Sequence, residues 1–381
     1  MSQRATHILA AALLTLFTRH AQSQSPELHG QASASVAGNT DNADDAGFGL
    51  RYFPDFLAGQ VIGDGLDASM ELSLNALATG SYRRNELASY DGTIKLYRGW
   101  LRISTDRFET RIGLQKISFG SALLFRPLMW FDRIDPRDPL QLTDGVYGIV
   151  SRYTFQDNLN FWLWGLYGND ETQGWELAPT EKKTAEYGGR AQAPLWSGEL
   201  GVSYHHRRAD IRSLLPAGAV GSSTIPEDRL GFDGKWDVGI GAWFEAALTH
   251  DETGIPDLQY QRQATVGGDY TFSVGNGLYA AAEYFRSDNP PSALGSADGL
   301  GFSGLTMNYP VGILDQLSVI VYRDWKDRQW YRIITWQRKY DNISFYLLGF
   351  WDPDTFLIYR SQGSTNAFAG TGIQILAVFN H

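Results

Sequence analysis

Apolar and polar residues alternate with a period of two over most of the chain. In the first clear run, residues 28–38, one side is formed by Leu28, Ala32, Ala34 and Val36. This alternation is typical of half-buried β-strands, because successive side chains of a strand point to opposite faces. It predicts strands at residues 28–38, 48–53, 66–82, 93–104, 108–119, 146–155, 159–168, 184–193, 199–207, 230–237, 240–250, 261–272, 278–287, 300–309, 316–323, 329–340, 343–351 and 370–380.

One predicted hairpin, residues 93–104 with 108–119, shows how the two faces of the strands differ. One face is apolar and would point outward, with Tyr97, Leu101, Ile103, Phe108, Ile112 and Leu114. The other face is polar and would point into an interior, with Arg98, Arg102, Glu109, Arg111 and Gln115. Apolar side chains outside and polar side chains inside are the arrangement of a water-filled barrel in a membrane.

The predicted connections alternate between short turns and long loops. Residues 194–198, 238–239 and 341–342 are short, whereas residues 169–183 and 208–229 are long. Membrane barrels have this asymmetry, with short periplasmic turns and longer outer loops, and bacterial ones have an even number of strands. We predict an all-β fold, a transmembrane antiparallel β-barrel of about 18 strands. With about 16 strands instead, residues 28–60 would form a periplasmic arm or plug.

Composition supports a barrel and excludes several other classes. Aromatic residues make up 13% of the 381 residues, with 41 glycines, while the mean hydropathy is only −0.27. Beyond residue 20 there is no apolar run long enough to span a bilayer as a helix. The formal net charge of −10 argues against nucleic acid, which requires a basic surface. The absence of cysteine excludes disulfides and thiolate metal sites.

The first residues have the pattern of a secretory signal peptide. Arg4 supplies a positive charge, residues 8–17 are apolar, and residues 21–23 offer small side chains for cleavage. We therefore predict a signal peptide at residues 1–23 and a single barrel domain at residues 24–381. The predicted location is the outer membrane of a Gram-negative-type cell.

Residues 120–145 differ from everything around them, because they combine bulky apolar residues with charged ones between two strands. Long loops in compact folds are usually functional, and this composition does not suit disorder. We interpret the stretch as a loop folded into the barrel. Its polar and aromatic residues would form a pore constriction: Arg126, Trp130, Asp132, Arg133, Asp135, Arg137 and Asp138. Arg126 and Arg137 are expected to be partly free to act on solutes. Alternatively, these charges pair with each other and the wall and hold the loop in place.

Strand parity also predicts a ladder of charges along the lumen. Arginines would line one wall, at Arg98, Arg102, Arg111, Arg152 and Arg190. Carboxylates would line a roughly opposite wall, at Glu245, Asp269 and Glu283. Opposed charges would orient dipolar or anionic solutes. Alternatively, the charges only hydrate the interior and link neighbouring strands, and a slip of one residue in register would invalidate individual assignments.

The segment Arg-Pro-Leu-Met-Trp-Phe-Asp-Arg-Ile-Asp-Pro-Arg-Asp-Pro at residues 126–139 follows a Gln-Lys-x-x-Phe-Gly sequence at residues 115–120. Together with the strand pattern of residues 28–380, it resembles the outer-membrane porin superfamily. The resemblance extends to larger substrate-specific and alginate-export barrels and to poorly characterised porin-like proteins with this loop sequence. In such porins the third outer loop narrows the lumen, and on our count residues 120–145 are the third long loop. These barrels usually end in an aromatic residue, whereas this chain ends in Phe379, Asn380 and His381.

The predicted function is a porin-like channel for the diffusion of small hydrophilic or anionic solutes, without enzymatic activity, cofactor or metal. Outer-membrane lipid, lipopolysaccharide and small polar solutes are the expected partners, and the barrel could form homo-oligomers. The alternatives are a structural or adhesive barrel with a closed lumen, or a barrel enzyme using Ser203 with His205. His205 and His206 are the nearest approach to a metal site. Asp251, Glu252 and Asp257 suggest either a cation-binding loop or a solvated acidic one.

Overall fold

The computed structural model describes residues 23–40, 46–63, 65–83, 86–214, 224–252, 259–353 and 370–381. The predicted signal peptide lies outside these residues, apart from Ser23, which begins the first strand. Asp257 lies outside them as well. Within the described residues, no helix is long and apolar enough to cross a membrane.

All of the strands predicted from the alternation are confirmed, and 18 strands are present in the described residues. Their bounds are β1 (Ser23–Asn39), β2 (Ala46–Gly63), β3 (Leu66–Arg83), β4 (Glu86–Ser104), β5 (Phe108–Gln115), β6 (Val146–Thr154), β7 (Asn160–Tyr167), β8 (Ala185–Leu195), β9 (Gly198–Asp210), β10 (Thr224–Asp237), β11 (Gly241–Asp251), β12 (Tyr260–Phe272), β13 (Leu278–Asp288), β14 (Gly299–Pro310), β15 (Asp315–Asp324), β16 (Trp330–Lys339), β17 (Ile343–Trp351) and β18 (Thr371–Asn380). Residues 28–39 belong to β1 and residues 46–60 to β2, so the alternative prediction of an arm or plug over residues 28–60 is wrong.

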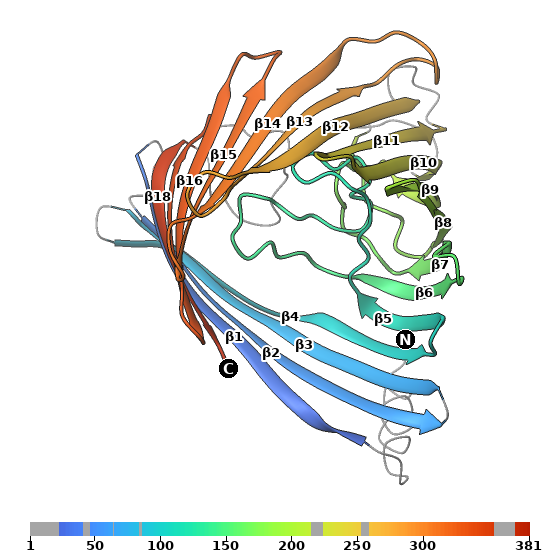
Figure 1. Cartoon of the computed structure of the whole chain (residues 1–381), viewed down its shortest axis with the longest axis horizontal. Helices are drawn as coiled ribbons and strands as arrows, with labels where there is room; N and C mark the ends of the chain where they lie inside the picture. Colours follow the sequence, from blue (N-terminus) through green and yellow to red (C-terminus); the bar gives the residue numbers. More distant parts are fainter. Residues whose placement is uncertain are drawn as a thin grey trace.

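The sheet is a closed antiparallel barrel. Each strand pairs with its neighbours in the sequence, and β1 pairs with both β2 and β18. Figure 1 shows the ring, in which the first strands meet the last ones. Closure matters because a barrel without a free edge leaves no row of unpaired backbone groups.

The outer surface is apolar and the inner surface is polar. Outward-facing Leu50, Ile94 and Leu163 are 54%, 78% and 67% exposed, which would be costly in water and is suited to lipid. Between them, the alternate residues of the same strands face the interior. The period-two pattern of the sequence therefore corresponds to the two faces of the barrel wall.

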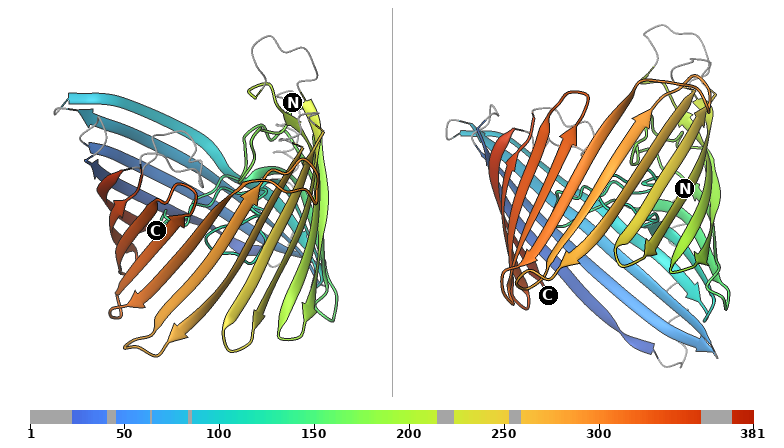
Figure 2. Two further views of the ribbon diagram at one scale, coloured as in Figure 1. Left: turned by 90° about the horizontal axis from the view of Figure 1, so that it is seen from above. Right: turned by 45° about the horizontal axis from the view of Figure 1, so that its top comes forward.

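Two long loops lie at the end of the barrel opposite the short turns. The loop between β5 and β6, residues 116–145, is called L3 here, and the loop between β7 and β8, residues 168–184, is called L4. L3 is the third connection at that end, and it runs inside the ring of strands in Figures 1 and 2. The predicted inward loop is thus present, and it begins four residues earlier than expected, where β5 ends at Gln115.

One predicted orientation is wrong. Tyr97 was expected on the outer face, but its ring lies 4.7 Å from that of Phe53, which is buried on the inner face. The cause is an irregularity in the β3–β4 pairing, where Ser73 opposes Arg98 but the next residue, Leu74, opposes Leu96. The extra residue on β4 is Tyr97, and a bulge of this kind redirects a side chain.

Candidate functional site: the inward loop and the lumen

The start of L3 is held by a carboxylate of the barrel wall. Glu283 on β13 is buried, and its two oxygens accept hydrogen bonds from the backbone N–H groups of Leu123, Leu124 and Phe125 at 2.6–2.9 Å. The indole N–H of Trp243 donates a fourth, at 2.8 Å. Hydrogen bonds to a charged acceptor are stronger than neutral ones. Glu283 therefore fixes three consecutive residues of L3.

A second carboxylate, Glu245 on β11, does the same for the neighbouring turns of L3. Its oxygens accept hydrogen bonds from the backbone N–H groups of Ala122 at 2.7 Å and Leu128 at 3.1 Å. Gly120 passes so close that a Cβ atom there would lie 2.2 Å from Oε1 of Glu245. Gly120 also has a φ of +101°, which only glycine adopts easily. The sequence therefore needs glycine at this point to bring L3 against the wall.

Apolar side chains of L3 pack into two clusters on the inner wall. In the first, Phe119, Trp130 and Phe131 pack against Trp164 on β7 and against neighbouring wall residues. In the second, Phe125 is fully buried among Phe285, Phe302, Tyr322 and Tyr331, which come from β13 to β16. Trp130, predicted to line the constriction, is 4% exposed and anchors L3 to the wall instead. Burial of this many aromatic rings makes L3 part of the core.

The charged residues of L3 form ion pairs. Arg126 donates to Asp132 at 2.9 Å, and Asp132 is 1% exposed. Arg137 is buried and lies 2.8 Å from Asp135 and 3.3 Å from Asp352, just beyond β17. The structure thus supports the alternative in which these charges hold L3 in place, and Arg126 and Arg137 are both engaged.

The two remaining charged residues of the predicted constriction are closer to solvent. Arg133 is half-buried and its guanidinium lies 2.6 Å from Glu171 of L4. Asp138 is half-buried and accepts a hydrogen bond from the backbone N–H of Leu140. Burial raises the pKa of the Asp138 carboxyl above its usual range, and burial raises that of Asp352 to about 6.

L4 contacts both L3 and the wall, and its contact with L3 is one that the sequence did not predict. The indole N–H of Trp175 donates to the carbonyl of Arg126 at 2.9 Å, and the backbone N–H of Gly174 donates to the carbonyl of Asp132 at 3.1 Å. Glycine is required at position 174, since a Cβ atom would lie 1.7 Å from the carbonyl oxygen of Met129. The sequence signal for this contact is the Gly-Trp pair at residues 174 and 175, a glycine next to an aromatic residue inside a long loop.

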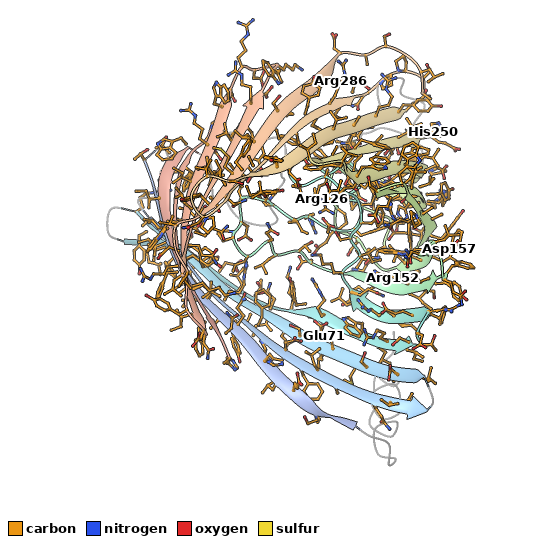
Figure 3. The ribbon with its side chains drawn as sticks, viewed as in Figure 1. Glu71, Arg126, Arg152, Asp157, His250 and Arg286 are labelled. Atoms are coloured by element: carbon orange, nitrogen blue, oxygen red, sulfur yellow. The ribbon has the colours of Figure 1, made fainter. Side chains whose placement is uncertain are left out.

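The inner wall divides into a sealed sector and a hydrated one. On β8 to β13 many of the inward charged side chains are buried, namely Arg190, Arg207, Arg229, Asp233, Glu245 and Glu283, whereas Glu199, Lys235 and Asp269 are not. On β2 to β6 most inward charged side chains are half-exposed, namely Arg51, Asp55, Glu71, Arg102, Glu109, Arg111 and Arg152. In Figure 3, Glu71 and Arg152 project from this wall toward the interior, and Arg126 lies on L3 beyond them. Solvent therefore reaches the lumen along β2 to β6.

The residues of the predicted ladder have different roles in the two sectors. Arg102 and Arg111 lie 3.7 and 3.2 Å from Glu109, and the Arg152 guanidinium lies 3.7 Å from the ring centre of Trp162. Arg98 is buried and donates to the carbonyl of Thr143 in L3.

The other members do not form an opposing wall. Arg190 donates to Asp233 at 2.8 Å inside the sealed sector, and Asp269 accepts a hydrogen bond from Tyr279. Glu245 and Glu283 bind the backbone of L3 rather than facing arginines across water. The predicted ladder thus separates into hydrated arginines and carboxylates that anchor L3.

The minor candidate sites do not assemble. Ser203 and His205 are each 1% exposed, and His205 is enclosed by Trp130, Phe131 and Trp164. His206 is adjacent in the strand and faces the other way, where it lies 2.8 Å from Asp228. Two neighbouring strand residues on opposite faces cannot share a ligand. The described residues contain no group of three or more side chains suited to a metal ion.

Comparison with proteins of known structure identifies the fold of this chain. No protein-family model matches the chain, and no curated protein matches it. Among solved structures it is similar to OccD3 (OpdP) of Pseudomonas aeruginosa, with 9% identity, coverage of 95% of this chain and 93% of that one, and a TM-score of 0.57. It is also similar to an anion-selective porin from Comamonas acidovorans, with 15% identity, coverage of 94% and 99%, and a TM-score of 0.50. The chain therefore has the fold of the outer-membrane porins along nearly its whole length.

Proposed function

We propose that this protein is an outer-membrane channel through which small hydrophilic solutes diffuse, with a weak preference for anions. The observation that carries the proposal is the division of the lumen. L3 and L4 pack against wall residues from β7 to β16, whereas most inward charged side chains along β2 to β6 are half-exposed. A barrel with an apolar exterior and one hydrated interior sector supports passage of water-soluble molecules across lipid.

The proposed location is the outer membrane of a Gram-negative-type cell. The exposed apolar belt would contact membrane lipid, and the end carrying L3 and L4 would face outward, where lipopolysaccharide is the neighbouring lipid. One solved structure with this fold is named as a porin, which supports the same location. A homo-oligomer is compatible with the apolar exterior.

The anion preference rests on the balance of charge in the hydrated sector. Four half-exposed arginines (Arg51, Arg102, Arg111 and Arg152) face three half-exposed carboxylates (Asp55, Glu71 and Glu109). Glu109 is shared between Arg102 and Arg111. Among the described residues, no carboxylate lies within ion-pair distance of Arg152, whose guanidinium covers the ring of Trp162 instead. Glu109 is also the cross-strand partner of Arg152, so this one carboxylate is shared among three arginines and the group keeps a net positive charge toward the passage.

The test is the reversal potential of single channels in a planar bilayer under a potassium chloride gradient. The native protein should conduct and favour chloride. Arg152→Gln should shift the reversal potential toward potassium, while Arg107→Gln, at the exposed β4–β5 turn, should leave it unchanged. A native protein that inserts as a folded barrel but carries no current would contradict the proposal.

The sealed sector also favours a second candidate, a barrel of structural or adhesive role whose lumen is closed. L3 and L4 together bury the inner wall over many strands, as a plug does. The same bilayer experiment separates the two, because a closed barrel would be silent at all voltages and salt concentrations.

A further inference from the structure

The half of β4 nearest the long loops extends beyond β5, the strand beside it. β4 pairs with β3 from Glu86 to Ser104, but with β5 only from Gly99 to Ser104. The cause is the shortness of β5, which has 8 residues where β4 has 19. Figure 2 shows these ends of β3 and β4 projecting past the strands beside them. One edge of β4 therefore has no neighbouring strand over this half.

The end of L3 covers only the first part of this edge. Arg98 donates to the carbonyl of Thr143, and Lys95 lies 2.6 Å from Asp144. Residues 87–94 lie beyond these contacts, and all of them are exposed. Among the described residues, their backbone groups bond to no backbone segment other than β3. Because alternate residues of a strand direct their N–H and C=O groups to opposite edges, the groups on the second edge remain available.

This edge lacks the features that usually prevent an exposed strand from pairing with another chain. Proteins protect such edges with proline, lysine or a bulge. β1 also extends past its neighbour β18, over the residues before Gly30, and there it has Pro26 and an irregularity between Gln24 and Glu27. On β4, residues 89–94 pair regularly with β3 and include no proline, lysine or arginine. The edge of β4 is therefore open to a further strand.

The side chains beside this edge specify which strand would fit. Tyr90 and Ile94 face outward and are 81% and 78% exposed. The residues between them alternate to the inner side, which is polar and includes Asp91. Asp91 forms no ion pair with a described residue, since Lys95 on the same face pairs with Asp144. A strand with apolar residues outward and a basic residue opposite Asp91 would match both faces.

A second copy of this chain does not supply such a strand. Copies in one membrane point the same way, so an axis along the membrane normal relates them. Barrel strands tilt by about 35–45° from that axis, so two copies of β4 brought together across it would cross at about 70–90° and could not pair. The unpaired stretch of β1 lies at the opposite end of the barrel, beside the end of β2 that precedes a short turn.

We propose that the free edge of β4 pairs with an extended segment of another polypeptide, at the end of the barrel that carries L3 and L4. The segment adds a strand beside residues 89–94, with apolar side chains outward, polar side chains inward and a lysine or arginine opposite Asp91. Main-chain hydrogen bonds supply the affinity, and the alternating side chains supply the specificity. Pairing does not require conduction, so it is independent of the proposed channel function.

The probe is a fluorescently labelled nine-residue peptide in which threonine alternates with valine and lysine replaces the central threonine. Its binding to the full protein in detergent micelles is measured by fluorescence anisotropy, with empty micelles as the blank. Saturable binding of one peptide per chain is expected. The same peptide methylated at every backbone nitrogen keeps its side chains but has no N–H donor, and it should bind at least about tenfold more weakly. Equal binding of the two peptides, or no binding of the unmethylated one, would overturn the proposal.

A charge exchange tests the position of Asp91. A second peptide carries glutamate in place of the central lysine. The native protein should prefer the lysine peptide by about two- to fivefold, and Asp91→Lys should prefer the glutamate peptide by a similar factor. The control Asp106→Lys makes the same change at the exposed β4–β5 turn and should keep the native preference. An Asp91→Lys protein with the native preference would count against pairing at this edge.

The absence of cysteine allows the peptide to be located by a single introduced thiol. Thr93→Cys places this thiol on β4, and the control Thr79→Cys places it on the same face of β3, one strand farther from the edge. A lysine peptide with cysteine in place of one threonine should form a disulfide with Thr93→Cys at least about tenfold faster, because neighbouring strands are about 4.8 Å apart and a disulfide joins Cα atoms within about 7 Å.

Two results of this cross-linking would refute the assignment. One is equal rates of disulfide formation for Thr93→Cys and Thr79→Cys. The other is a Thr93→Cys protein that forms disulfide-linked dimers without peptide, faster than Thr79→Cys does, which would show that a second copy occupies the edge. Either result would leave the conductance of the channel, and with it the proposed function, untouched.

Discussion

Replacing Glu283 by glutamine should release the start of L3 into the lumen without changing the size of the side chain. One carboxylate oxygen accepts from Leu123 and Trp243, and the other accepts from Leu124 and Phe125. Whichever oxygen becomes an amino group, two hydrogen bonds are lost and two buried N–H groups face another donor. At about 1.5–3 kcal/mol for each hydrogen bond to a charged group, attachment of L3 weakens by about 3–6 kcal/mol. The population of detached L3 then rises by about two to four orders of magnitude.

Two assays report on the detachment of L3. Trypsin should cut the Glu283→Gln protein after Lys116, Arg133 or Arg137. In the native barrel Arg133 is paired with Glu171 of L4 and Arg137 with Asp352 beyond β17, which protects these sites. Single-channel records should show a larger or noisier conductance. The control is Glu71→Gln, which removes the same charge from the hydrated sector, where Glu71 has the strand residues Asp55, Trp100 and Arg111 as neighbours. If Glu283→Gln and Glu71→Gln are cut by trypsin at the same rate and show the same single-channel conductance and current noise, the anchoring role of Glu283 is refuted.

Three further changes test other contacts. Gly174→Ala should lower the midpoint temperature of thermal unfolding more than Gly168→Ala does. Both glycines have a positive φ, but only at position 174 would a Cβ atom lie against the backbone of L3. Equal decreases in the midpoint temperature would argue against the contact between L3 and L4. Arg190→Met leaves Asp233 buried and unpaired, and it should lower the free energy of unfolding in urea by about 3–5 kcal/mol. The double variant Arg190→Met with Asp233→Leu should recover most of that free energy. A double variant no more stable than the single one would contradict this reasoning. Burial raises the pKa of Asp352 above 3.8 to about 6, so its contribution to stability is present below pH 3.8 and is lost as the pH rises to about 6. The native protein should therefore lose stability relative to Asp352→Asn between pH 4 and 6, and parallel pH profiles would show that Asp352 does not titrate in this range.

The strands and the inward loop were predictable from sequence because both follow from local patterns. Lipid on one side and water on the other impose alternation on every strand, so residues as far apart as Leu50 and Leu163 obey one rule. The bulge at Tyr97 was not predictable, since it depends on the pairing of β4 with β3 rather than on β4 alone.

The roles of individual charges were harder to predict than the strands. Parity placed Glu245 and Glu283 on the inner face correctly, but it could not show that L3 would arrive there with its backbone N–H groups directed at them. The same limit applies to Arg137, whose partner Asp352 is distant in the sequence. A loop that combines arginines and aspartates can act on solutes or pair internally, and only the tertiary contacts distinguish the two outcomes.

The contacts of L3 with both the wall and L4 have a consequence for redesign of the barrel. The N–H groups of Trp175 and Gly174 bind L3 carbonyls on one side, while Glu245 and Glu283 bind L3 N–H groups on the other. Shortening or replacing L4 would therefore change the position of L3, and with it the width of the lumen, even though L4 lies outside the hydrated sector. Deleting L3 alone to widen the lumen would expose the apolar residues of L4 that pack against L3. The two loops are best exchanged together, as a single cassette.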